Sequence, residues 1–205
     1  MPPEEPNLDE PKLGKPGAGL PLVEGLILRY WAFPRFLKRS SWEQRLRLFA
    51  KEAERIVKLV EPFSADRAVR SRRVLVPRQP GLEDSSRYWS IDMTLEHLVF
   101  VGTMMQQFVA ELLAGKQPTV KADTAAVKPT GQGEVDRLAE FSTFVARYRK
   151  QLTDPTTLGE ATLRHPHPWL GPLDAGGWLA IAALHQRVHR QQLEAIIAGL
   201  TTTKR

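Results

Sequence analysis

Segments with helical spacing of apolar residues constrain the fold of this chain more than any other feature. The clearest begins at Trp42, where Ser41 and Gln44 match the pattern of a capping box, and ends before Pro62. Apolar residues fall on one stripe of this segment, as in a helix that packs on its neighbours. These residues are Trp42, Leu46, Phe49, Ala53, Ile56, Val57 and Val60. We therefore predict a long amphipathic helix here.

A second helix is predicted after Ser90, a residue type that caps helix N-termini. Asp92 lies in its first turn, where the helix dipole favours an acid, and Gly115 is a natural residue just past its end. Its spacing predicts an inward stripe that contains one histidine among apolar residues. The stripe is Met93, His97, Val101, Met104, Phe108 and Leu112.

Two further helices complete the pattern. One covers residues 134–152, and the last covers about 175–199, between a capping Asp174 and a terminating Gly199. No alternating run is long enough to indicate a sheet. The sequence therefore predicts an all-α fold, a four-helix bundle over residues 41–200.

The segments outside the predicted helices have a different character. Residues 1–21 contain six prolines and few large apolar side chains, so we expect a disordered leader. Residues 22–40 read either as a short helix packed across the bundle or as an amphipathic patch that touches a membrane. Pro34, which we expect to break the helix, favours packing. The basic stretch 65–88 is predicted to be a long irregular connection or a short hairpin.

Composition excludes several classes of function. The chain has no cysteine, so thiolate ligands and a cysteine nucleophile are excluded, which fits a cytoplasmic protein. No apolar run reaches the roughly eighteen residues of a membrane span, so we expect no stable membrane insertion. The net charge is +6, but no nucleic-acid module accompanies the arginines. We interpret them as a solvated basic surface and expect no nucleic-acid partner.

Two histidines of the last predicted helix, His185 and His189, are four residues apart and share a helical face. They are either satisfied core histidines or two ligands of a metal, and His97 on the other inward stripe is a candidate third ligand. Three imidazoles would leave one position of a tetrahedral metal open for water or substrate. Position 186 is glutamine, so the zinc-protease motif with glutamate after the first histidine is absent.

The remaining histidines, His165 and His167, alternate with prolines in a loop before the last helix. Such a stiff loop either presents an imidazole over a site or is a solvent-exposed turn, and loop composition favours the turn. Trp169 and Trp178 are interpreted as core or pocket-lining residues.

The patterns WSIDMTLEHL and HPWLGPLDAGGWLAIAALHQRVHRQQ resemble the DinB-like superfamily, and the resemblance covers residues 41–199. This superfamily includes YfiT-like metal-dependent hydrolases and bacterial thiol S-transferases that use thiols such as mycothiol or bacillithiol. The resemblance implies a four-helix bundle that binds a divalent metal (zinc, nickel or iron) through His97, His185 and His189. It also implies a low-molecular-weight thiol as a cofactor.

These observations lead to a functional hypothesis with two rivals. The first is a metal-dependent enzyme with a small-molecule substrate, of thiol-transfer or hydrolase type, in which arginines of residues 67–78 bind an acidic thiol. The second is a non-catalytic stress-response or binding bundle in which the metal only ties two helices together. The third is a metal-free bundle whose histidines are core polar groups. Each of the three hypotheses is compatible with a homodimer.

Overall fold

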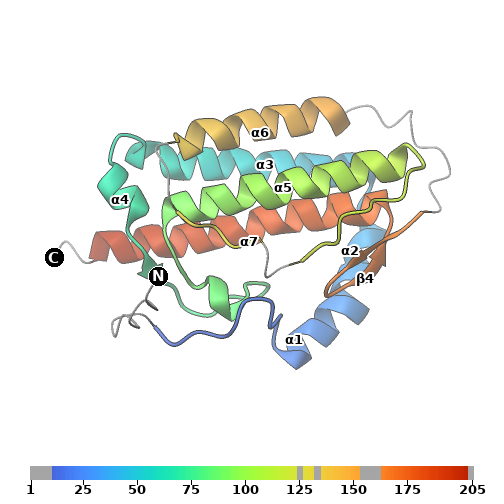
Figure 1. Ribbon diagram of the computed structural model, residues 1–205, viewed down its shortest axis with the longest axis horizontal. Helices are drawn as coiled ribbons and strands as arrows, with labels where there is room; N and C mark the ends of the chain where they lie inside the picture. Colours follow the sequence, from blue (N-terminus) through green and yellow to red (C-terminus); the bar gives the residue numbers. More distant parts are fainter. Residues whose placement is uncertain (1–10, 124–126, 132–134, 153–162, 203–205) are drawn as a thin grey trace, which may run out of the picture.

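Four long helices run side by side in the computed structural model (Figure 1). The structure describes residues 11–123, 127–131, 135–152 and 163–202, and the statements below concern those residues. The bundle helices are α3 (Trp42–Val60), α5 (Ile91–Leu113), α6 (Arg137–Leu152) and α7 (Ala175–Thr202). The all-α prediction is confirmed.

Helix α7 lies against both α3 and α5, and α6 covers the opposite side of that pair (Figure 1). Aromatic side chains fill the space between the helices, with Phe49 of α3 stacked on Tyr148 of α6 at 4.0 Å between ring centroids. Burying such large rings supplies most of the favourable free energy of a core. The largest fully buried side chains include Trp178, Tyr148, Phe49, Phe108, Phe141 and Phe144.

The predicted helix caps are present. Ser41 and Gln44 make both hydrogen bonds of the capping box at the start of α3. The Ser90 hydroxyl accepts the N–H of the third residue of α5 at 3.1 Å, and the Asp174 carboxylate accepts an N–H in the first turn of α7 at 2.7 Å. Gly115 adopts a φ of 68°, the left-handed conformation that follows many helices.

Three details of the helical prediction are wrong. Helix α6 begins at Arg137 rather than at residue 134. Helix α7 does not stop at Gly199 but continues to Thr202. A Cβ atom at Gly199 would lie 2.6 Å from Cγ1 of Val74, so the glycine permits a close approach of the chain rather than ending the helix. On α5 it is Met105 that is buried, and Met104 only packs against the edge of the core.

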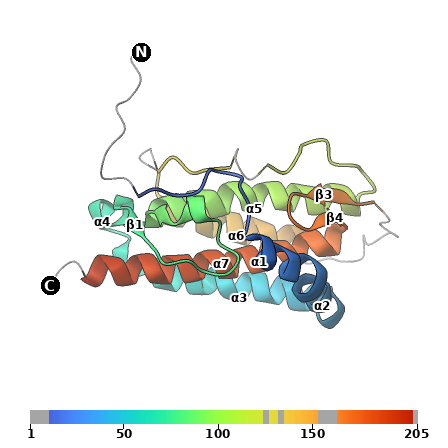
Figure 2. The same ribbon diagram turned by 90° about the horizontal axis from the view of Figure 1, so that it is seen from below.

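Residues 22–39 form one continuous helical segment at the side of the bundle (Figure 2). Pro34 does not break it. The π-helical turn η1 ends directly before α2, so the hydrogen-bond pattern of the segment changes just where the proline lacks its N–H group. Phe33 is buried and Phe36 packs on the core, so the inner side of the segment packs as expected. The elements are α1 (Leu22–Ile27), the π-helical turn η1 (Leu28–Ala32) and α2 (Phe33–Arg39).

The basic connection contains a short hairpin, the second of the two predicted forms. Strands β1 and β2 are antiparallel, with Val74 opposite Trp89. Arg70 pairs with buried Asp92 at 3.1 Å and ties the connection to α5. The elements are η2 (Glu61–Phe63), α4 (Arg67–Ser71), β1 (Val74–Leu75), the 3-10 turn η3 (Asp84–Ser86) and β2 (Tyr88–Trp89). A second hairpin, not predicted, pairs β3 (His165–His167) with β4 (Gly171–Leu173).

The expected leader divides into two parts. Residues 1–10 lie outside the described residues. Residues 11–20 are not the free chain that we expected, since they follow the bundle and donate backbone hydrogen bonds to it (Figure 2). The N–H of Gly14 donates to Asp84 at 2.7 Å, and that of Gly19 donates to Glu83 at 2.9 Å. Composition cannot reveal these two contacts because their donors are backbone N–H groups.

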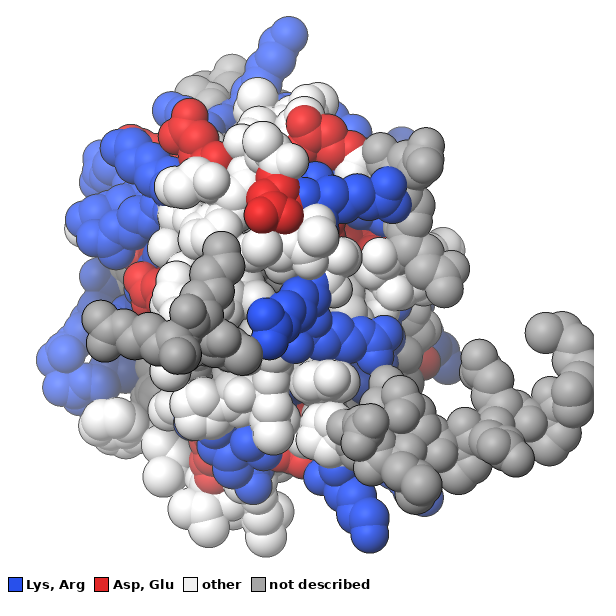
Figure 3. Space-filling view, turned by 90° about the vertical axis from the view of Figure 1, so that its left-hand side faces the viewer, with Lys and Arg blue, Asp and Glu red and all other residues white. Residues whose placement is uncertain are grey.

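The end of the molecule that carries α4 and the C-terminus shows many Lys and Arg side chains, with Asp and Glu side chains interleaved near the top of the view (Figure 3). None of the described helices combines the length and the apolar character that crossing a bilayer requires.

Close packing between α5 and α6 gives a first testable prediction. A Cβ atom at Gly102 would lie 2.3 Å from Cζ of Phe144. Gly102→Ala should therefore destabilise the protein by about 1–3 kcal/mol through overpacking, despite the better helix propensity of alanine. Urea unfolding measures this change. Gly25→Ala is the matched control, because its Cβ would meet nothing within 4 Å, and a Gly102→Ala variant as stable as this control would contradict the packing argument.

Candidate metal centre

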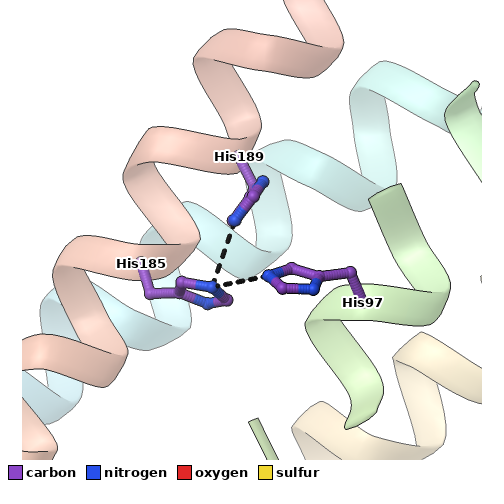
Figure 4. A group of neighbouring side chains, drawn as sticks. All are labelled: His97, His185 and His189. Carbon is purple, nitrogen blue, oxygen red and sulfur yellow. Dashed lines mark hydrogen bonds between the residues drawn. The ribbon is translucent and has the colours of Figure 1, made fainter. Parts of the chain in front are cut away.

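Helices α5 and α7 bring the three predicted histidines together (Figure 4). His97 projects from α5, and His185 and His189 project from successive turns of α7. The Nε2 atom of His185 lies 3.1 Å from Nε2 of His97 and 3.1 Å from Nε2 of His189. One ring nitrogen of each residue lies within 4.8 Å of the others, so the three form a single cluster.

Hydrogen bonds at the other ring nitrogens orient two of these imidazoles. Nδ1 of His97 lies 2.9 Å from the carbonyl oxygen of Val127, and Nδ1 of His189 lies 2.7 Å from Oε1 of Gln192. The amide nitrogen of Gln192 donates to the carbonyl of Ser86 at 2.7 Å, which keeps its oxygen toward His189. Because an oxygen of this kind only accepts, both Nδ1 atoms carry the proton and both Nε2 atoms present lone pairs.

The two contacts at Nε2 of His185 cannot both be hydrogen bonds when all three imidazoles are neutral. A proton on Nε2 of His185 can serve only one of its two 3.1 Å contacts, so in the neutral cluster the other contact joins two lone pairs. A cation among the three nitrogens would relieve that repulsion. Three neutral imidazoles are good ligands for zinc, nickel or iron, and the Nδ1 atoms of His97 and His189 have the orienting partners typical of metal-bound histidines. The residues present therefore fit a divalent metal ion.

Burial keeps these histidines in the uncharged form that a metal needs. It lowers the pKa of His97 to about 4, although the Val127 carbonyl acts in the opposite direction. Burial also lowers the pKa of His189 to about 3. The pKa of His185 falls well below its usual value through burial, with a further contribution from the neighbouring imidazoles. All three rings are thus neutral at pH 7 in the metal-free protein.

Trp89 of β2 covers the cluster from the connection side. Its ring is stacked on His189 with planes 6° apart and centroids 5.9 Å apart, and it lies 5.0 Å from the ring of His97. The sequence reasoning assigned no role to Trp89 or to Gln192. Trp89 directly precedes the capping Ser90 in the motif that carries the family resemblance, and that adjacency was the available signal.

A cavity of about 540 Å³ adjoins the cluster, and all three histidines are part of its wall. Most of the wall is apolar, and the helical segment 22–39 and α7 supply much of it. Apolar lining residues include Ile27, Leu28, Val101, Met105, Leu184 and Val188. Trp169 also lines the cavity and Trp178 is fully buried, as predicted for both.

Charged residues of the cavity wall divide into two kinds. The carboxylates of Glu24 and Glu83 already accept backbone N–H groups, from Gly81 at 2.5 Å and from Gly19 at 2.9 Å. The cations are Lys128 and Arg187. No arginine of residues 67–78 lines the cavity, so the structure does not place those arginines where they would bind an acidic thiol.

The loop histidines are both buried, so the solvent-exposed turn that we favoured is wrong. The hairpin of β3 and β4 folds them inward. His165 packs 4.5 Å from the ring of Phe108 and does not line the cavity. His167 does line it, and its Nδ1 accepts the N–H groups of Trp169 at 3.1 Å and Leu170 at 3.3 Å. Neutral His167 therefore carries its proton on Nε2, and burial lowers its pKa to about 4.

Comparison with known proteins agrees with this architecture. The family model of the DinB superfamily matches residues 48–193, a range that begins in α3 and includes all three clustered histidines. No curated protein and no solved structure matches the chain. Because the family match spans most of the sequence, the chain belongs to the DinB superfamily.

Proposed function

We propose that this protein is a metal-dependent enzyme that transfers a low-molecular-weight thiol to an electrophilic small molecule. In this proposal His97, His185 and His189 bind one divalent ion. The observation that carries it is the meeting of three imidazole Nε2 atoms at the wall of a largely apolar cavity. When bound, the metal would act as a Lewis acid that lowers the pKa of a thiol or a water at its open position.

Thiol transfer suits the other groups of the cavity better than hydrolysis. In such a transfer the thiol releases its proton to solvent, the sulfur forms a bond to an electrophilic carbon, and the leaving group departs from that carbon with its bonding electron pair. No carboxylate base is needed once the thiol is ionised. This matches a cavity in which Glu24 and Glu83 are both engaged by backbone N–H groups and position 186 is glutamine.

The remaining wall residues have natural roles in this reaction. The Nε2–H group of His167 is a hydrogen-bond donor whose tautomer is fixed by two backbone N–H groups, and it would stabilise negative charge on the leaving group. Lys128 and Arg187 would bind acidic groups of the thiol. The apolar wall would hold the electrophile.

A second candidate function is a non-catalytic bundle in which the metal is structural. One observation favours it: the three histidines come from only two helices, α5 and α7, so a bound ion would cross-link those helices. Such a link would add the binding free energy to folding stability.

Turnover separates the two candidates. Untagged protein loaded with zinc or nickel is mixed with a panel of low-molecular-weight thiols and monochlorobimane, and formation of the fluorescent adduct is followed. We expect adduct formation at least about 10-fold above the background reaction, since alignment and ionisation of the thiol both raise its rate. Chelation should abolish the gain and added metal should restore it. A protein that binds metal but accelerates no thiol of the panel would support the structural role instead.

A further inference from the structure

The helical segment 22–39 exposes an apolar face that the bundle does not cover. Pairs of large side chains recur every four residues on its outer side, and each is between 49% and 77% exposed. A folded protein rarely leaves so many neighbouring large apolar groups in water without a use for them. We call these residues the apolar ridge: Leu22, Val23, Leu26, Ile27, Tyr30 and Trp31.

Basic residues continue the pattern toward the end of the segment. Arg35, Lys38 and Arg39 are exposed at the next positions of the same four-residue repeat, and Arg29 is exposed beside the ridge. The guanidinium of Arg35 lies 5.6 Å from the ring centroid of Trp31. The single acidic residue of the segment, Glu24, is engaged by the backbone N–H of Gly81 on the bundle side. The outer face therefore combines apolar and positively charged side chains.

The ridge is held firmly in this position. Phe33 is 3% exposed, and Leu28, Phe36 and Leu37 pack on the core from the inner side of the segment. Because the inner face already satisfies the packing needs of the segment, the outer apolar residues are free for an interaction with another surface.

We infer that the apolar ridge docks on an anionic lipid surface. Aliphatic side chains of the ridge would enter the boundary between headgroups and acyl chains, with Tyr30 and Trp31 at the depth that aromatic residues prefer. Arg35 and Lys38 would contact the lipid phosphates. This is peripheral binding, and it requires no membrane-spanning helix.

Charge argues for lipid rather than for a second copy of the chain. A symmetric dimer through the ridge would bring the same basic residues of both copies to one interface, where like charges repel. An anionic lipid surface offers opposite charge along the whole segment. An acidic protein partner is the remaining occupant, and a monomeric wild-type protein that does not bind the vesicles described below would favour it over lipid.

Docking would also place the cavity beside the lipid, because Ile27, Leu28 and Ala32 of the same segment line it. This consequence rests on the proposed function, and it points to an apolar electrophile that partitions into membranes. The docking itself depends only on the outer face of the segment.

Co-sedimentation with vesicles tests the inference on the full-length protein. We expect binding to phosphatidylglycerol vesicles that weakens with salt, and much weaker binding to phosphatidylcholine vesicles. Leu26→Ser with Trp31→Ser should lower binding to phosphatidylglycerol by about 10-fold or more, because each exposed apolar group removed lowers the gain on insertion. Arg35→Glu with Lys38→Glu should lower both the binding to phosphatidylglycerol vesicles and its dependence on salt.

Phe100→Ser is the control. Phe100 is a 57% exposed residue of α5 outside the ridge, so this variant should bind as the wild type does.

Several results would overturn the inference. Wild-type protein that does not sediment with phosphatidylglycerol vesicles excludes lipid docking, and a dimer lost in the Leu26→Ser, Trp31→Ser variant without vesicle binding assigns the ridge to a second copy. Equal binding by the ridge and Phe100→Ser variants also contradicts it. Metal content and bimane turnover are measured in the same variants. Neither should change, because none of the four substituted residues lines the cavity. Failure of vesicle binding with intact turnover therefore leaves the proposed function standing.

Discussion

His185→Ala is expected to lower the affinity of the protein for zinc by at least about 100-fold and to remove stoichiometric metal from the purified protein. His185 is the central member of the cluster, since its Nε2 makes both 3.1 Å contacts with the other two imidazoles. Loss of a ligand should exceed the 10–100-fold cost that is typical of changes to the groups that orient ligands. Competition with a chromophoric chelator measures the affinity, and elemental analysis measures the content.

The control for this prediction is His165→Gln. His165 is as buried as His189 at 4% exposure, but it lies against Phe108 outside the cavity, so this variant should keep its metal. Circular dichroism checks that both variants remain helical. A folded His185→Ala protein that retains one tightly bound ion per chain would refute the three-His assignment.

The metal-free protein is expected to lose several kcal/mol of unfolding free energy between about pH 6.5 and pH 4.5. His97 and His167 have pKa values lowered to about 4 by burial, and that of His189 is lowered to about 3. In the unfolded chain these imidazoles bind protons near pH 6.5, so in this window the unfolded state holds more protons than the folded state. Stability therefore falls as the pH falls, by up to about 1.4 kcal/mol per pH unit for each such histidine.

Urea unfolding in the presence of a chelator, at pH values from about 7 to about 4.5, measures this dependence. His97→Gln provides the comparison, because it removes one titrating imidazole and should reduce the slope below pH 6.5 in proportion. Unfolding free energy that stays constant over this range would show that the imidazoles reach water in the folded protein.

Much of the architecture follows from local sequence. The stripe of α3, its capping box and the caps of α5 and α7 are decided by residues within one or two turns, and these were predicted. His97 was placed on an inward face because it keeps helical spacing with Val101 and Phe108, which are both buried. Helical periodicity thus made the three histidines candidates for one site, and the family resemblance then indicated which three would be ligands.

The parts that escaped prediction depend on contacts between distant segments. The orientation of His97 depends on a carbonyl of Val127, and that of His189 depends on Gln192 and a carbonyl of Ser86. Backbone groups of connections leave no trace in residue patterns. The burial of His165 and His167 likewise follows from a hairpin whose strands are only three residues long, too short for an alternating pattern to show.

The cavity takes no residue from α3 or α6. Two of the four bundle helices therefore serve as scaffold, and their sequences can change without altering any group that a ligand would meet. The segment 22–39, the connection 65–90 and the loop around Val127 provide much of the remaining wall, so they are the natural places for selectivity to diverge. A redesign that seeks higher stability would alter α3 and α6, and one that seeks a new specificity would alter the connections.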